Sequence, residues 1–161
     1  MAKTIFRKIG GRIVPIRIGS VRLDTDLMGG KARDVFAKVG DTVLGHARIV
    51  VPDEGKFATL DYVRVNHEFR GKGIGRSLFK HAQELLGRAG KSFLRADKIQ
   101  HQAQVKIRAS AGKSVFIGYG RGQAKKLSPL EAINEVKKLR KGLDYRDVQA
   151  TTMIPKKWRR K

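Results

Sequence analysis

The segment Arg70-Gly71-Lys72-Gly73-Ile74-Gly75 is the part of this chain whose residue types and spacing best suit chemistry with a phosphorylated ligand. Its three glycines remove the Cβ atoms that would keep a ligand away from the backbone. An amphipathic pattern follows directly, so a helix would point its free N–H groups and its positive dipole end at the same loop. The segment therefore predicts a cradle for a diphosphate.

Two other glycine-rich phosphate motifs do not fit the spacing. A Rossmann or kinase G-x-G-x-x-G motif that begins at Gly71 requires glycine at position 76, where Arg76 stands. A P-loop that ends in Gly112-Lys113-Ser114 requires glycine at position 107, where Ile107 stands. The remaining alternatives are a different phosphate motif, or a strand–turn–helix in which glycine serves only the turn.

The residues from Leu60 to Arg76 read as a strand that feeds this loop and the helix after it. Val65 and the six residues from Arg70 to Gly75 match the pattern Val-x-Pro-x-x-Arg-Gly-x-Gly-x-Gly/Ala, with His67 in place of proline. In this the chain resembles the GNAT superfamily of acyl-CoA-dependent N-acetyltransferases, most strongly over residues 57–112. The resemblance implies acetyl-CoA as cosubstrate, without a metal, and cofactor contacts from Val63, Val65, Arg70, Gly71, Lys72, Gly73, Ile74, Gly75 and Arg76.

Acetyl transfer to an amine requires the neutral amine, which is scarce at pH 7 because the pKa of lysine is about 10.4. The resemblance points to Asp61 and Tyr62 as a base or a water relay, and to the main-chain N–H groups of Val63 or Val65 as donors to the thioester carbonyl. The alternative for the first pair is structural, because Tyr62 could pack in the core and Asp61 could pair with an arginine.

The leaving thiolate lacks its usual acid in this chain. The family commonly carries Asn-x-x-Ala-x-x-x-Tyr-x-x-x-Gly-Phe, whereas here His101, Arg108 and Lys113 replace the asparagine, tyrosine and phenylalanine. An arginine cannot donate its proton at neutral pH, but it could stabilise a thiolate electrostatically. Asp61, Tyr62 and Arg108 are therefore the catalytic candidates, without the standard acid.

The net charge is the second strong feature. The chain has 36 Lys and Arg against 14 Asp and Glu, a formal charge of +22. Small soluble domains manage with about 2 to 8 charges, and one coenzyme A brings only about four negative charges. The excess predicts nucleic acid or another polyanion as a partner.

Composition excludes several other classes. The chain has no cysteine, so it has no disulfide framework, no thiolate zinc site and no cysteine nucleophile. Its four histidines are scattered without ligand spacing. Cations interrupt the apolar residues near the N-terminus, so neither a signal peptide nor a membrane span is expected. We expect a cytoplasmic protein that does not bind membranes, with nucleoid or virion association as further options.

The elements that must position these residues suit an α/β fold of the α+β type. The sequence predicts a hairpin turned at Gly40-Asp41 and a helix over 73–88 that follows the loop. This order favours a GNAT-like mixed, mostly antiparallel sheet flanked by helices over residues 1–120. The predicted strands are 12–18, 20–24, 35–39, 42–51, 57–66, 93–99 and 114–119, and a second helix is predicted over 102–111.

Residues 121–161 read as a separate C-terminal part: a basic linker, an amphipathic helix and a Lys/Arg-rich tail. Ser128-Pro129-Leu130-Glu131 is a complete helix start, and the apolar face of helix 129–141 should dock on the core or on a partner. In the tail, Trp158 could stack on a base or pack against the core.

Two functions follow. The family usually inserts two helices between its first two strands, and only residues 24–33 are available here, so the acceptor cleft should be open. The first function is an N-acetyltransferase that acts on a macromolecule, protein or RNA, in a nucleic-acid-rich setting. The alternative is a catalytically reduced GNAT-like structural or nucleic-acid-associated protein, for example a phage or virion component.

Overall fold

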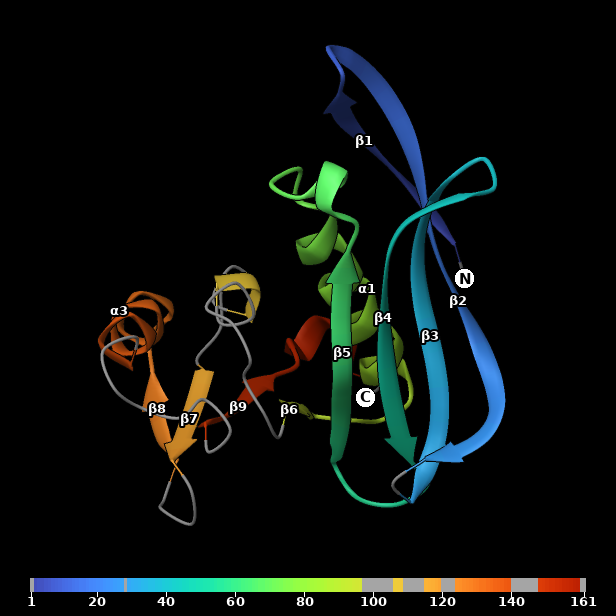
Figure 1. Cartoon of the computed structure of the whole chain (residues 1–161). Helices are drawn as coiled ribbons and strands as arrows, with labels where there is room; N and C mark the ends of the chain where they lie inside the picture. The colour runs from blue at the N-terminus through green and yellow to red at the C-terminus, as the bar shows by residue number, and fades with distance from the viewer. Residues whose placement is uncertain are drawn as a thin grey trace.

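A computed structural model describes residues 2–27, 29–96, 106–108, 115–119, 124–139 and 148–159 of the chain. The described strands form one nine-stranded sheet in the order β1-β2-β3-β4-β5-β6-β9-β7-β8. Among the described strands, only the β5–β6 junction is parallel, and every other junction is antiparallel. The predicted mixed, mostly antiparallel α/β sheet is confirmed (Figure 1).

The described residues include nine strands, two α-helices and two 3₁₀ helices. They are β1 (Lys3–Ile9), β2 (Arg12–Leu27), β3 (Gly30–Val39), β4 (Thr42–Pro52), β5 (Phe57–Val65), η1 (His67–Phe69), α1 (Ile74–Arg88), β6 (Phe93–Ala96), β7 (Val115–Tyr119), β8 (Lys125–Leu127), α3 (Pro129–Leu139), β9 (Val148–Met153) and η3 (Lys156–Trp158).

The N-terminal strands are mostly longer than the sequence indicated, and β1 was not predicted. The predicted hairpin is confirmed, with Val39 opposite Thr42 and Gly40 at a φ of 55°. In contrast, β2 runs unbroken through Gly19, which the sequence suggested as a break between two strands. Gly19 lies opposite Phe36, and a Cβ on Gly19 would come within 2.7 Å of the Phe36 ring. This glycine makes room for a side chain and does not turn the chain.

Helix α1 covers one side of β2 to β5, which we call the α1 face. The predicted helix over 73–88 is confirmed at Ile74–Arg88, and its apolar stripe includes Leu78 and Leu86, both fully buried. These side chains pack against buried strand residues such as Ile18 and Ile49. The hydrophobic core lies between α1 and this face of the sheet.

The other side of the same strands is not covered by a described helix. The chain passes from β2 to β3 through a short turn in which Gly29 has a φ of 75°, so no helix is inserted there in the described residues. Figure 1 shows α1 on one side of β2 to β5 and no helix across the other. We call this uncovered side, which carries Phe36, His46 and Tyr62, the open face.

The C-terminal part contributes to the same sheet. The sequence did not predict β8 and β9, yet β9 lies between β6 and β7. Helix α3 contacts β7 and β8, and its capping box is confirmed because Ser128 N–H donates to Glu131 Oε2 at 2.7 Å. The division after residue 120 stays a prediction.

Two predicted elements are described only in part. Strand β6 is described to Ala96, so residues 97–99 of the predicted strand lie outside the described residues. Of the predicted helix over 102–111, residues 106–108 are described and are helical. In the described part of the chain, no helix combines the length and the apolar character that a membrane span requires.

Candidate functional site

The loop between β5 and α1 has the backbone geometry of an anion cradle. Gly71 and Gly73 both have a φ of 74°, which a residue with a side chain adopts only with strain. Gly73 is the N-cap of α1; no described side chain caps this helix end, and its first turn has no acidic residue. The first N–H groups of the helix are therefore available to a ligand, with the positive end of the helix dipole behind them.

Arg7 is a site residue that the sequence analysis missed. It reaches the loop from β1, where its Nη2 donates to Ser77 Oγ at 3.1 Å and its Nη1 donates to the Phe6 carbonyl at 2.8 Å. Its Nε lies 3.4 Å from the position of a Cβ added to Gly73. The available signal was the alternation of Lys3, Ile5, Arg7 and Ile9, which turns these four residues to the α1 face.

Strand β5 leaves one edge open beyond its first residues. It pairs with β4 along most of its length, but in the described residues it pairs with β6 only from Phe57 to Thr59. Every second residue of the following stretch turns its N–H and C=O toward this gap. Val63 and Val65 pack against the core here, and Arg70 Nε donates to the Val65 carbonyl at 3.1 Å.

Asp61 is the extra residue of a β-bulge in β5. Arg48 lies opposite Tyr62 and Ile49 opposite Leu60, so nothing in β4 lies opposite Asp61. A bulge bends its strand and re-aims the neighbouring side chains. As a result the Asp61 side chain is exposed beside Tyr62.

Tyr62 lies half-buried on the open face among cationic groups. The guanidinium carbons of Arg48 and Arg64 lie 5.3 and 5.2 Å from its ring centroid, and the His46 ring contacts it edge-on at 5.3 Å. Burial raises the pKa of Tyr62, and the nearby carboxylate of Asp34 raises it further. Tyr62 is therefore a neutral phenol at pH 7, able to relay a proton but not to act as a strong base.

Arg108 is buried on the other side of the sheet. Its side chain is 1% exposed, its Nη1 donates to Thr152 Oγ1 at 3.3 Å, and its guanidinium carbon lies 5.3 Å from the Phe79 ring centroid. Its Nε and Nη2 have no hydrogen-bond partner among the described residues. Burial lowers the pKa of Arg108 to about 10, so the side chain remains a cation at neutral pH. His101 and Lys113 lie outside the described residues.

The predicted site residues thus lie in three places. The first place is the gap and the start of α1, which are surrounded by Val63, Val65 and residues Arg70 to Arg76. Ile107 also reaches this place, because its Cδ1 lies 3.1 Å from a Cβ added to Gly75. Asp61 and Tyr62 are presented on the open face, whereas Arg108 lies in the core on the α1 face. The gap beside β5 connects the two sides of the sheet, because β5 pairs with β6 only from Phe57 to Thr59 in the described residues.

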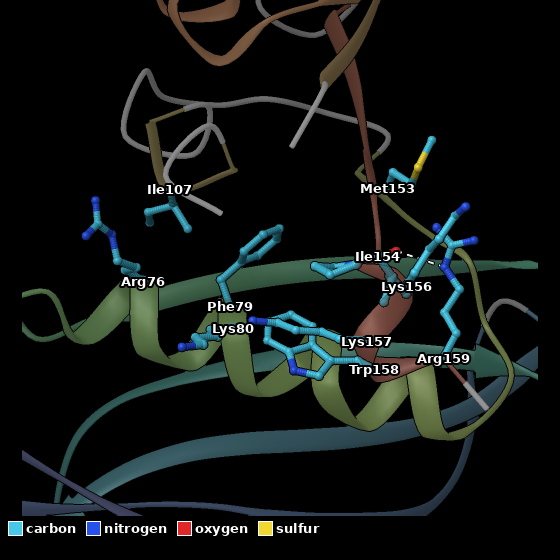
Figure 2. Close-up of a pocket in the computed structure, with 11 residues that line it drawn as sticks. Arg76, Phe79, Lys80, Ile107, Met153, Ile154, Lys156, Lys157, Trp158 and Arg159 are labelled. Atoms are coloured by element: carbon cyan, nitrogen blue, oxygen red, sulfur yellow. Dashed lines mark hydrogen bonds between the residues drawn. The ribbon is translucent and has the colours of Figure 1, made fainter. Parts of the chain in front are cut away.

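A pocket of about 570 Å³ lies between α1 and the C-terminal segment (Figure 2). It begins at Arg76, directly after the loop, and it has no acidic residue in its lining. Trp158 anchors its far wall, because the Trp158 backbone packs directly on Gly87 of α1. The lining comprises the cations Arg76, Lys80, Lys156, Lys157 and Arg159 with the apolar residues Phe79, Ile107, Met153, Ile154, Pro155 and Trp158.

Metal chemistry has no support in the described residues. They contain no cluster of three or more His, Asp or Glu side chains that could hold a metal ion. His67, which replaces the family's proline, is exposed in η1.

This sheet, with its glycine-rich loop at the start of helix α1, is the fold that comparison with known proteins identifies. The model of the acetyltransferase (GNAT) family matches residues 18–105, more than half of the chain. The chain therefore belongs to the GNAT family. No curated protein sequence matches significantly.

Solved structures support the same fold. A GNAT acetyltransferase from Elizabethkingia anophelis with acetyl-CoA bound is 13% identical and superposes with a TM-score of 0.54, covering 86% of this chain and 97% of that one. The IAA acetyltransferase from Bacillus cereus ATCC 14579 is 17% identical with a TM-score of 0.53, covering 84% and 99%.

A tandem GNAT protein from the clavulanic acid biosynthesis pathway is 24% identical with a TM-score of 0.46. The match covers 56% of this chain and 32% of that protein, so this chain spans about a third of its length.

Proposed function

We propose that this protein transfers an acetyl group from acetyl-CoA to an amine on a macromolecular acceptor in a nucleic-acid-rich setting. The observation that carries the proposal is the uncapped N-terminus of α1, set behind Gly71 and Gly73 and next to the Arg7 guanidinium. Free N–H groups, a helix dipole and a fixed cation favour a diphosphate together.

The neighbouring surfaces suit the rest of the cofactor. Beyond Thr59, the edge of β5 with which no described strand pairs offers main-chain N–H and C=O groups to an amide-containing arm that leaves the loop toward the gap. At the other end of the loop, the basic pocket that starts at Arg76 has the charge and the apolar walls that a phosphorylated nucleoside requires. We assign the diphosphate to the loop, the pantetheine arm to β5 and the nucleotide end to this pocket.

The chemistry requires one proton transfer and one leaving group. The neutral amine attacks the thioester carbonyl, the C–N bond forms, and the C–S bond breaks to release the coenzyme A thiolate. Asp61 accepts the amine proton, directly or through the Tyr62 hydroxyl, and the main-chain N–H of Val63 or Val65 polarises the carbonyl. Arg108 stabilises the thiolate as a buried cation with unused donors, and solvent returns the proton to sulfur.

The acceptor side favours a large substrate. The short turn between β2 and β3 leaves Asp61 and Tyr62 on a side of the sheet that no described helix encloses. A macromolecule can reach such a surface, whereas a small amine would find few walls to bind. The charge of +22 favours acceptors that are acidic or associated with nucleic acid.

Calorimetric titration with acetyl-CoA tests the cofactor assignment. Gly73→Glu places a carboxylate in the cradle and should abolish binding. The matched control is Gly90→Glu at the opposite end of α1, where φ is 78° and a Cβ meets nothing within 4 Å. Equal losses in both variants, or no binding by the unmodified protein, would overturn the proposal.

Arg7 offers a sharper version of this experiment. Arg7→Ala should weaken acetyl-CoA binding roughly tenfold or more, because a charge-assisted contact is lost. Binding of acetyl-pantetheine, which has no diphosphate, should be unchanged. The exposed Arg12 at the tip of the same hairpin provides the control variant Arg12→Ala. If Arg7→Ala weakens both ligands equally, Arg7 does not contact the diphosphate.

The alternative is a GNAT-like protein with reduced catalysis that serves as a nucleic-acid-associated component, for instance in a phage or virion. The observation that favours it is Arg108, which occupies the position of the family's tyrosine and lies in the core. Mass spectrometry of a cell extract incubated with the protein and isotopically labelled acetyl-CoA separates the two functions. Labelled acetyl groups on macromolecules support the enzyme, and cofactor binding without transfer supports the alternative.

A further inference from the structure

The open face carries a row of aromatic rings. Directly opposed residues of antiparallel strands share a side, so the strand register places Phe36 with His46, and Arg48 with Tyr62. Phe6 on β1 has the same orientation and is 62% exposed. The open face therefore presents one ring on each of β1, β3, β4 and β5, and Gly19 on β2 leaves room for the Phe36 ring.

Cations alternate with these rings. Lys38 Nζ lies 4.8 Å from the Phe36 ring centroid, and Arg48 and Arg64 flank Tyr62. Two further cations, Lys8 and Arg17, share the side of Phe6 by register. The cations of the open face are Lys8, Arg17, Lys38, Arg48 and Arg64.

Acidic groups offset only part of this charge. Arg48 donates two hydrogen bonds to the Asp34 carboxylate, at 2.8 and 3.1 Å, so this carboxylate offsets the charge of Arg48. Asp61 is the other carboxylate beside Tyr62. Lys8, Arg17, Lys38 and Arg64 thus keep the open face cationic.

We propose that the open face binds single-stranded nucleic acid. Stacking of bases on aromatic rings combined with phosphate contacts to interleaved cations is how sheets and grooves hold single strands. Neighbouring strands lie about 4.8 Å apart, so Phe36, His46 and Tyr62 form a continuous path across β3, β4 and β5. The path ends at Asp61 and Tyr62, where we place the acceptor.

Charge argues against the other occupants of this surface. A second copy of the chain would bring cations against cations. An acidic polypeptide would satisfy the cations but leave the exposed Phe6 ring without a planar partner. Duplex nucleic acid would present phosphates alone, because its bases are stacked internally and unavailable to the rings.

This inference deepens the nucleic-acid setting of the proposed function, but it does not require acyl transfer or acyl-CoA binding. The two can therefore fail separately. Gly73→Glu should abolish acetyl-CoA binding and leave nucleic-acid binding unchanged. If the unmodified protein does not bind acetyl-CoA, the proposed function is overturned, but the inference about nucleic acid is not affected.

Fluorescence anisotropy with labelled oligouridylate of roughly 12 nucleotides tests the cations. Affinity should fall linearly with the logarithm of salt concentration. Arg17→Glu/Lys38→Glu should reduce the slope by about 1.4, since each phosphate contact in a single strand contributes about 0.7. The matched control is Lys125→Glu/Lys126→Glu on β8, at the opposite end of the sheet, which changes the net charge equally.

The rings are tested by removing the most exposed one. Phe6→Ala should weaken oligouridylate binding roughly fivefold or more without changing the salt slope. The control Leu130→Ala removes a side chain that is 68% exposed on α3, and it should leave the affinity unchanged.

Three results would overturn the inference. If the two double variants changed the salt dependence of the affinity equally, binding would depend on the net charge of the protein and not on the open face. Duplex binding as tight as single-strand binding would remove the role of the rings. Binding of polyglutamate as tight as that of oligouridylate would assign the open face to an acidic polypeptide.

Discussion

The two sides of the strands β1 to β5 are built for opposite purposes. Between the α1 face and helix α1, aliphatic side chains such as Ile18 and Ile49 of the strands and Leu86 of the helix are fully inaccessible. The open face has half-buried or exposed rings and cations in the corresponding positions. One face therefore supplies stability and supports the loop, and the other is available to a partner.

A short turn produces this difference. Because β2 and β3 are joined through Gly29, no described helix crosses the open face, and the residues there need not be apolar. Asp61 and Tyr62 remain accessible as a consequence, whereas Arg108 is enclosed on the side of α1. The proposed cofactor site and the proposed acceptor site are therefore separated by the sheet and connect at the gap beside β5.

The largest expected effect compares equivalent truncations on the two faces. Leu86→Ala should lower the free energy of unfolding by about 3 kcal/mol, because it leaves a cavity in the core. Phe6→Ala should change it by less than about 0.5 kcal/mol, because the ring is already exposed. Urea unfolding monitored by circular dichroism measures both. Equal losses would mean that the open face is covered and that the comparison is wrong.

Acid should lower the free energy of unfolding through His81, a buried residue of helix α1. Its buried ring has no hydrogen-bond partner among the described residues, and burial lowers its pKa from 6.5 to about 4. Between these values the unfolded state binds the proton and the folded state does not. The free energy of unfolding should therefore fall by on the order of 2 to 3 kcal/mol as the pH drops from about 6.5 to 4.

Chemical denaturation across this pH range measures the effect. His81→Leu removes the titrating group and should flatten the profile in that window. The neighbouring Glu84, which accepts from Lys3 Nζ at 2.8 Å, is unchanged in this variant. Parallel profiles for the two proteins would assign the acid sensitivity to other groups.

The contact between α1 and the C-terminal segment is tested at Gly87. Alanine in a helix interior is normally about 1 kcal/mol better than glycine. Here a Cβ would collide with the backbone of Trp158, so Gly87→Ala should destabilise the protein by roughly 1 to 2 kcal/mol. The emission of Trp158, the single tryptophan of the chain, should also shift.

Gly75→Ala provides the contrast within the same helix. Its Cβ would lie closest to the flexible end of Ile107 at 3.1 Å and would meet Val65 Cγ2 at an ordinary 3.6 Å, so the effect on stability and on emission should be smaller. A more stable Gly87→Ala protein with unchanged emission would show that the C-terminal segment does not pack on α1 in solution.

The last prediction concerns Arg108, which has the most direct bearing on the proposed catalysis. Arg108→Met removes a buried cation with unpaired donors and should raise the free energy of unfolding by about 1 kcal/mol. The turnover rate should fall, while the affinity for acetyl-CoA stays unchanged. A stabilised variant with full turnover would exclude Arg108 from thiolate stabilisation.

Local patterns predicted the central part of the fold well. The hairpin at Gly40-Asp41, the strand into the loop, helix α1 and the capping box of α3 all depend on residues close together in the sequence. Strand β1 was missed because charged residues interrupt its apolar pattern, and β9 was missed because polar residues interrupt its pattern. Both strands depend on distant partners for their stability. For β1 these include the contacts of Lys3 with Glu84 and of Arg7 with Ser77.

The candidate site, like the fold, was predictable only where it depends on residues close together in the sequence. The sequence identified the loop, because glycines at fixed spacing before an amphipathic helix report local backbone geometry. It could not identify Arg7, which is remote in sequence from Gly73, or the pocket wall formed by Trp158. The roles predicted for Asp61, Tyr62 and Arg108 stay proposals.

The sequence by itself determined the cradle, the charge of +22 and the class of fold, because these depend on composition and on spacing within one turn or one strand. The tertiary structure alone decided which side of the sheet each side chain faces. A single-residue bulge at Asp61 and a short turn at Gly29 set those orientations, and strand pairing between distant segments is what fixes them.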